Sequence, residues 1–116
     1  MNKSEIFNGL CEYAVEITGI DIRYAKGRRE EYVRLRAAIM VILMNYYGVT
    51  TTLAGHFFNR DHTTAVHHKA NHPWRYKSDD EYAYLYDELV KHVLLCKRNQ
   101  VDLDVQEVLG YIKLIG

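Results

Sequence analysis

The segment from Glu30 to Tyr47, EEYVRLRAAIMVILMNYY, constrains the fold more than any other part of the sequence. Its apolar residues recur at steps of three and four, at Val33, Ala37, Met40, Met44 and Tyr47. That period places them on one face of an α-helix. Gly48 follows directly, and a glycine in a left-handed conformation commonly ends a helix. The segment therefore predicts a long helix that buries one stripe of side chains.

The N-terminal part of the chain also has helical spacing. A first helix is expected to begin at the N-cap Ser4 and to end at Thr18-Gly19. Its apolar positions are Ile6, Leu10, Tyr13 and Ile17. A short helical turn within residues 20–25 and a basic loop from Lys26 to Arg29 are expected to connect it to the long helix.

Two short helices separated by a tight turn are expected next, over Thr50 to Phe57 and Asp61 to Asn71. Each begins with a residue whose side-chain oxygen can cap a helix N-terminus. The second of these helices is expected to end before Pro73, because the residue before a proline disfavours the helical region. In the second helix Val66 and Ala70 are four positions apart and are expected to face the core. Together the two helices have the proportions of a helix-turn-helix motif.

The C-terminal third predicts two more helices. Residues 78–81, Ser-Asp-Asp-Glu, form a capping box that opens a helix to about Arg98. The stripe that this helix is expected to bury is Tyr82, Leu85, Leu89, Val93 and Cys96. After a break at 99–104, a last amphipathic helix is outlined by Val105, Val108, Leu109 and Ile112. We expect it to pack on the body of the protein, with a homodimer through this helix as the alternative.

The sequence as a whole predicts an all-α protein of six or seven helices, since no segment has the alternation of a β-strand. At 116 residues, 48% hydrophobic and 26% charged, it is expected to form one globular domain over residues 1–98 with an extension over 99–116. Cys11 and Cys96 lie in apolar helical patterns without a CxxC pair, which favours buried, reduced thiols. We expect a cytoplasmic protein, because no signal peptide or apolar run of about 18 residues occurs.

The charge distribution favours a nucleic-acid partner although the net charge is zero. Between Ile22 and Lys77 there are ten Lys and Arg side chains against three carboxylates, a difference of +7. The remainder of the chain must then carry −7. A basic middle between acidic ends can attract phosphate to one face. Charges sorted by chance over helix surfaces are the alternative.

Residues 58–73, FNRDHTTAVHHKANHP, contain four histidines, an Asp, an Arg and two adjacent threonines. On a helix, a broad face would be shared by Thr63, Thr64, His67, His68 and Asn71. Such a face is rich in short donors and acceptors, as expected of a helix that lies in a DNA major groove. The helix N-terminus itself also favours a nearby phosphate.

This segment has three other interpretations. A zinc site could use His67, His68 and His72, but no HExxH motif and no nearby carboxylate or cysteine completes it. Acid–base catalysis by Asp61 and His62 is disfavoured, because adjacent residues point in different directions and no nucleophile follows at a helical step. A purely structural role, with Asp61 as a cap and solvated histidines, is compatible with DNA binding.

The string RDHTTAVHH, residues 60–68, resembles the signature of the C-terminal DNA-binding domain of the bacterial replication initiator DnaA. The similarity extends over about residues 8–95, through LCEYAVEITGIDIRYAKGRR, RLRAAIMVILMNYYG and VTTTLAGHFF. It implies an all-α, Trp-repressor-like fold in which the second short helix reads double-stranded DNA. The implied activity is sequence-specific binding in replication initiation or its regulation, without enzymatic activity, cofactor or nucleotide.

The resemblance also implies roles for single residues. Base contacts are expected from Asp61, His62, Thr63, Arg28 and Thr51, with Arg28 in the minor groove. Phosphate contacts are expected from Thr64, His67, Arg36, Arg60, Lys69, Arg34, Lys26 and Arg29. The chain departs from the family at Phe58-Asn59, where two glycines are usual, and at Met44, Ala70 and Asn71, where basic residues are common.

No GxxxxGK[ST] phosphate loop occurs in the chain. The resemblance therefore implies a freestanding DnaA-like module, such as a phage or mobile element carries, and not a whole initiator. A protein-interaction module that binds replication proteins, or a transcription regulator, is the alternative function.

Overall fold

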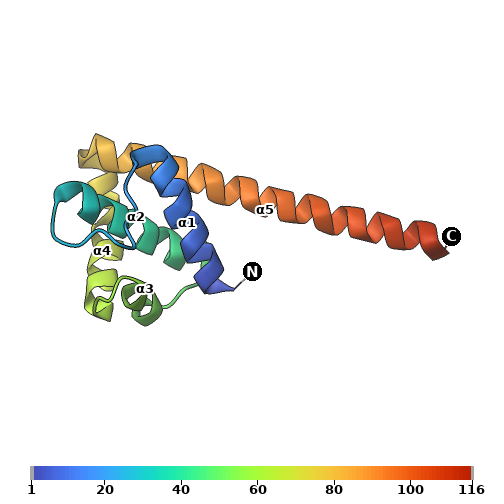
Figure 1. Ribbon diagram of the computed structural model, residues 1–116, viewed down its shortest axis with the longest axis horizontal. Helices are drawn as coiled ribbons and strands as arrows, with labels where there is room; N and C mark the ends of the chain where they lie inside the picture. The colour runs from blue at the N-terminus through green and yellow to red at the C-terminus, as the bar shows by residue number, and fades with distance from the viewer. Residues whose placement is uncertain (1, 116) are drawn as a thin grey trace.

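The computed structural model describes the backbone of residues 2–115 and the side chains of residues 2–98. Within that range the chain forms five helices and no strand (Figure 1), namely α1 (Lys3–Thr18), α2 (Glu30–Tyr47), α3 (Thr51–Phe57), α4 (His62–Ser78) and α5 (Asp80–Ile115). The all-α prediction is confirmed. Six or seven helices were too many, because residues 21–25 form one hydrogen-bonded turn and the last two predicted helices are a single helix.

Helix α2 is buried on every side and forms the centre of the fold. All ten residues from Leu35 to Met44 are buried, so the predicted single stripe was too narrow. The other four helices each pack against α2. A helix that is enclosed in this way needs apolar side chains around its whole circumference, which the run AAIMVILM supplies.

Most predicted helix ends are confirmed. Gly19 and Gly48 end α1 and α2 in the left-handed conformation, with φ of 74° and 63°. Thr50 caps α3 by accepting the Leu53 N–H at 3.2 Å, and Asp61 caps α4 by accepting the Thr63 N–H at 3.1 Å.

Two predicted caps were wrong. Asn2, two residues before Ser4, caps α1 by accepting the Glu5 N–H at 2.9 Å. Asp79 caps α5 by accepting the Tyr82 N–H at 3.2 Å, whereas the Ser78 hydroxyl donates to the Trp74 carbonyl at 2.8 Å. Asn and Asp are at least as good at this position as Ser. Asn2 and Asp79 therefore cap these helices in place of the predicted serines.

Helix α4 does not end before Pro73, contrary to the prediction, and continues to Ser78. A proline removes one backbone hydrogen bond, here to the carbonyl of Lys69. Lys69 and Pro73 are both exposed, so water can satisfy that carbonyl. The buried or half-buried side chains on the other face hold the helix on both sides of the proline.

The face of α4 that packs inward also differs from the prediction. Val66 is 49% exposed and Ala70 is exposed, whereas Ala65 and His68 are buried. The inward face continues through the half-buried His72 and Arg75. The helix is thus rotated by about one residue, or roughly 100°, from the predicted orientation.

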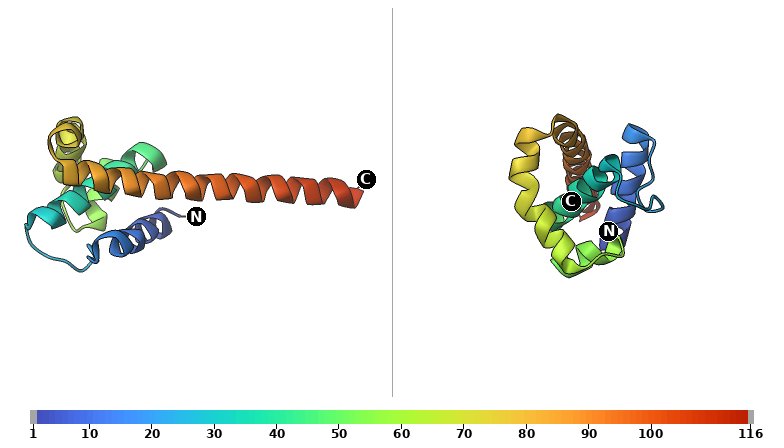
Figure 2. Two further views of the ribbon diagram at one scale, coloured as in Figure 1. Left: turned by 90° about the horizontal axis from the view of Figure 1, so that it is seen from above. Right: turned by 90° about the vertical axis from the view of Figure 1, so that its left-hand side faces the viewer.

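Helix α5 buries Tyr82, Leu85, Leu89 and Val93 as predicted. Cys96 is exposed and Cys11 is buried, so the prediction of two buried thiols was half wrong. The helix runs without the predicted break at 99–104 and extends past the other helices (Figures 1 and 2). Whether Val105, Val108, Leu109 and Ile112 pack on the body or on a second copy concerns side chains outside the described ones. None of the described helices combines the length and apolar character of a membrane span.

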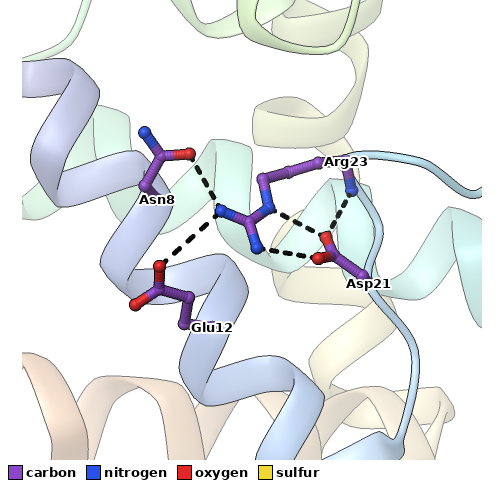
Figure 3. A network of polar contacts seen from close by, with 4 residues as sticks. All are labelled: Asn8, Glu12, Asp21 and Arg23. Carbon is purple, nitrogen blue, oxygen red and sulfur yellow. Dashed lines mark hydrogen bonds and ion pairs between the residues drawn. The ribbon is translucent and has the colours of Figure 1, made fainter.

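The turn after α1 is fastened to the fold by Arg23 (Figure 3). Its guanidinium donates to both carboxylate oxygens of Asp21, at 2.9 and 2.7 Å, and to Oδ1 of Asn8 at 3.1 Å. Glu12 lies 3.8 Å away on α1. Arg23 therefore fixes where the chain leaves α1, and with it the start of the basic loop.

Gly55 of α3 lies directly against the backbone of the turn that leads into α4. A Cβ there would lie 2.7 Å from the Asp61 carbonyl oxygen and 2.8 Å from that of Arg60. These atoms are backbone and cannot move without displacing the turn. Only glycine therefore allows the observed packing of α3 on α4.

We predict that Gly55→Ala lowers the free energy of unfolding by about 2 kcal/mol or more, because the new methyl group overpacks the turn. Gly9→Ala is the matched control, since a Cβ at Gly9 meets nothing within 4 Å. In the interior of α1 this control should raise stability by up to about 1 kcal/mol. Urea denaturation of both variants measures the two effects. Equal stability of the two variants would contradict the close approach.

Candidate nucleic-acid interface

The turn between α3 and α4 is formed by Phe58, Asn59 and Arg60. Asn59 adopts a left-handed conformation with φ of 54°, which asparagine tolerates better than most residues. Phe58 packs edge-on against Phe7 at 5.2 Å, and Phe57 stacks on the same ring at 4.5 Å. Apolar contacts with α1 thus hold this turn in place.

The first turn of α4 presents its polar side chains to solvent. Asp61, His62 and Thr63 are all exposed. The hydrogen bond from the Thr63 N–H lowers the pKa of the Asp61 carboxyl, with a smaller contribution from the charge of His62. Nδ1 of His62 lies 2.7 Å from Oδ1 of Asp61, so the expectation that these neighbours point apart was wrong. Their contact fixes the imidazole at the start of the helix.

The other residues of α4 that are predicted to contact DNA differ in their exposure to solvent. His67 and Lys69 are exposed and Thr64 is half-buried. The Asn71 amide lies 2.8 Å from Nε2 of His67, which holds this ring along the helix. His62, Thr63 and His67 therefore form an exposed polar face, while His68 of the predicted face points inward.

A basic hollow of about 460 Å³ lies between this turn and the basic loop. Five residues with cationic or ionisable nitrogen side chains line it, namely Arg23, Lys26, Arg36, His56 and Arg60. Among the described residues no carboxylate lines this basic hollow. His56 was not predicted as a site residue, since no motif marks it; its position in the last turn of α3 was the available signal. The hollow joins residues 22–26 and 56–60 into one positive surface. Its positive charge comes mainly from Lys26, Arg36 and Arg60, because Arg23 is paired with Asp21 and Glu12.

Arg36 is the central cation of the basic hollow and is only 6% exposed. One of its nitrogens donates to the Gly27 carbonyl at 2.6 Å. Within the described side chains no carboxylate lies within 4 Å of it. Burial, and then the charge of Arg60, lower its pKa. A buried guanidinium without a carboxylate partner is costly unless an anion compensates it.

The basic loop projects next to this hollow. Lys26, Arg28 and Arg29 are exposed, and Gly27 between them has a φ of 107° that only glycine adopts readily. The bond from Arg36 to Gly27 anchors the loop at this point. Thr51, the first residue of α3, is half-buried at the opposite end of that helix from the turn.

Arg34 is not part of this positive surface. Its guanidinium lies 2.8 Å from Asp79, 3.0 Å from Glu81 and 3.4 Å from Glu30. It is surrounded by carboxylates at the start of α5, where a phosphate would be repelled. We therefore leave it out of the proposed phosphate contacts.

The two remaining histidines of α4 have partners inside the protein. Nδ1 of His68 accepts a hydrogen bond from the Arg75 guanidinium at 2.9 Å, and Nδ1 of His72 lies 2.8 Å from the Tyr82 hydroxyl. Burial, and then the charge of Arg75, lower the pKa of His68 to about 4. Over the described residues no three His, Cys, Asp or Glu side chains are grouped to hold a metal ion.

We predict that protonation of His68 makes stability fall as the pH falls from 6.5 to 4. In that window the unfolded chain binds a proton that the folded chain excludes, because the folded pKa is the lower one. The full effect is roughly 3 kcal/mol. His68→Gln keeps an acceptor for Arg75 and should remove more than half of the slope; the rest comes from His72, whose pKa burial also lowers. Urea denaturation at several pH values measures this, and an unchanged slope in the variant would contradict it.

Comparison of the chain with protein-family models, curated proteins and solved structures found no match. The function proposed below rests on the residues and the geometry described above.

Proposed function

We propose that the chain is a sequence-specific double-stranded DNA-binding protein that uses α3 and α4 as a helix-turn-helix. Its fold would be that of the DnaA C-terminal domain and of Trp-repressor-like proteins. The protein would act as a freestanding module in replication initiation or its regulation. One observation carries the proposal: the exposed first turn of α4 lies beside a basic hollow that no described carboxylate lines.

In this proposal the N-terminus of α4 enters the major groove. His62 and Thr63 donate to or accept from base edges, as short polar side chains do there. Asp61 uses Oδ1 as the helix cap, so its Oδ2 is the atom that could accept from a cytosine amino group. Because Asp61 also holds His62, the two would be positioned before DNA arrives.

The phosphates would be held around this helix. Thr64, His67, Arg60 and Lys69 lie along or just before it. The exposed Lys26, Arg28 and Arg29 belong to the loop whose Lys26 lines the basic hollow beside the turn. Arg28 is proposed for the adjacent minor groove, where arginine is favoured by the negative potential. Arg36 would hold the loop through Gly27 and offer its charge to a phosphate at the basic hollow. Thr51 would meet the wall of the groove.

We predict that His62→Ala and Thr63→Ala each reduce the preference for a selected sequence by about 1–3 kcal/mol relative to scrambled duplex. These variants should leave binding to scrambled duplex nearly unchanged. Lys26→Ala combined with Arg29→Ala should instead weaken both duplexes and make the salt dependence shallower by about two phosphate contacts. Selection from a random duplex pool identifies the sequence, and fluorescence anisotropy at several salt concentrations measures affinity.

Lys91→Ala is the matched control, because it removes one exposed positive charge from α5, whose ion pair is with Glu88. It should change neither affinity nor salt dependence. A wild-type chain that prefers no duplex in the selection would refute the specific-binding proposal. A chain inert toward DNA even at low salt would favour the protein-interaction alternative.

A further inference from the structure

An apolar groove of about 510 Å³ lies where α1 ends and α2 and α5 begin. The buried side chains of Leu35 and Leu85 and the half-buried Ile17 and Ile20 supply its apolar lining. Tyr84 also lines it and is 62% exposed. This groove takes no part in the proposed DNA interface.

A second hollow of about 620 Å³ adjoins the groove and shares Arg34, Asp80 and Glu81 with it. Trp74, which is 70% exposed, lines this second hollow. Two large aromatic side chains thus stand in water beside a continuous depression. Tyrosine and tryptophan are the residue types most enriched at the energetic centres of protein interfaces.

The surroundings of both hollows are negatively charged. Five carboxylates line them, namely Glu30, Glu31, Asp79, Asp80 and Glu81. Arg34 is already paired with three of these, and Arg75 donates to His68. Arg29 also lies 3.9 Å from Glu31. Three guanidinium groups against five carboxylates leave an excess of two negative charges.

Helix N-termini explain part of this charge, since Glu30, Glu31, Asp80 and Glu81 stand in the first turns of α2 and α5. They do not explain the exposed Trp74 and Tyr84, nor the apolar groove that Tyr84 lines. Apolar lining, exposed aromatic rings and a negative rim occur here together. That combination matches a helix with one apolar face and basic flanks.

We propose that this apolar groove, with its negatively charged rim, binds a basic amphipathic helix of a partner protein. Apolar side chains of that helix would enter the groove between Ile17, Leu35 and Leu85. Its Lys or Arg side chains would face Glu31 and Asp80, and would stack on Trp74 or Tyr84. Nucleic acid is a poor occupant, because its phosphates would meet the carboxylates.

The apolar groove meets the proposed DNA interface at Glu31, which lies 3.9 Å from Arg29 of the basic loop. Figure 1 shows α3 and the start of α4 at the bottom of the helical body and the α4–α5 junction at its top. Helix α4 has 17 residues, which correspond to a length of about 25 Å. A partner helix and a DNA duplex could therefore bind at the same time.

The probe for this proposal is a fluorescein-labelled 18-residue Leu/Lys peptide designed as an amphipathic helix, titrated with the full chain in about 0.15 M salt. A peptide with Glu in place of every Lys is the first control. We expect saturable binding of the basic peptide and no binding of the acidic one. Absence of binding by the basic peptide, or equal binding of both, would overturn the proposal.

Variants of exposed groove residues locate the binding. Glu31→Gln combined with Asp80→Asn should weaken peptide binding by about fivefold, and Tyr84→Ser by about tenfold. The control pair Asp87→Asn with Glu88→Gln removes the same charge from the next turns of α5 and should change affinity less than twofold. Circular dichroism confirms that each variant is folded. If groove and control variants behave alike, the helix does not bind in this groove.

DNA binding separates this proposal from the function proposed above. The Tyr84→Ser variant should bind the selected duplex as the wild type does, and His62→Ala should bind the peptide as the wild type does. Glu31→Gln is left out of this comparison, because Glu31 lies 3.9 Å from Arg29 of the basic loop. Self-association that the groove variants abolish would also overturn the proposal, since a second copy would then be the occupant.

Discussion

The enclosure of α2 by the other four helices is the constraint on which the rest of the structure depends. Ten consecutive buried residues leave only the ends of α2 in contact with solvent. The basic loop enters at one end, and Gly48 turns the chain into α3 at the other. Both halves of the proposed DNA interface are thus attached to the same rigid helix. Their spacing is fixed by the core and not by the loops themselves.

Helix α4 shows how one segment can serve the core and the surface with the same residue type. His68 and His72 face inward and are neutral partners of Arg75 and Tyr82, whereas His62 and His67 face solvent. A buried imidazole must remain unprotonated to accept from a guanidinium, and burial supplies the necessary lowering of its pKa. The same side chain in water is free to donate or to accept.

The sequence allowed much of the fold to be predicted where a local rule decides the structure. The left-handed glycines at 19 and 48, the caps Thr50 and Asp61 and the turn between α3 and α4 follow from such rules. The orientation of α4 did not, because its inward face consists of Ala65 and the polar residues His68, His72 and Arg75, which give no apolar stripe. The end of α4 was missed for a similar reason, since tertiary packing outweighed the local effect of Pro73. The basic hollow needed the fold, because Arg36 and His56 meet only in three dimensions.

The surroundings of Arg36 have a consequence for how the protein would meet a polyanion. The chain holds this guanidinium against the Gly27 carbonyl, with further cations lining the same hollow. The repulsion between these positive charges is therefore overcome when the protein folds. In the proposed complex, a DNA phosphate would supply a counter-charge to a guanidinium that is already ordered and largely buried.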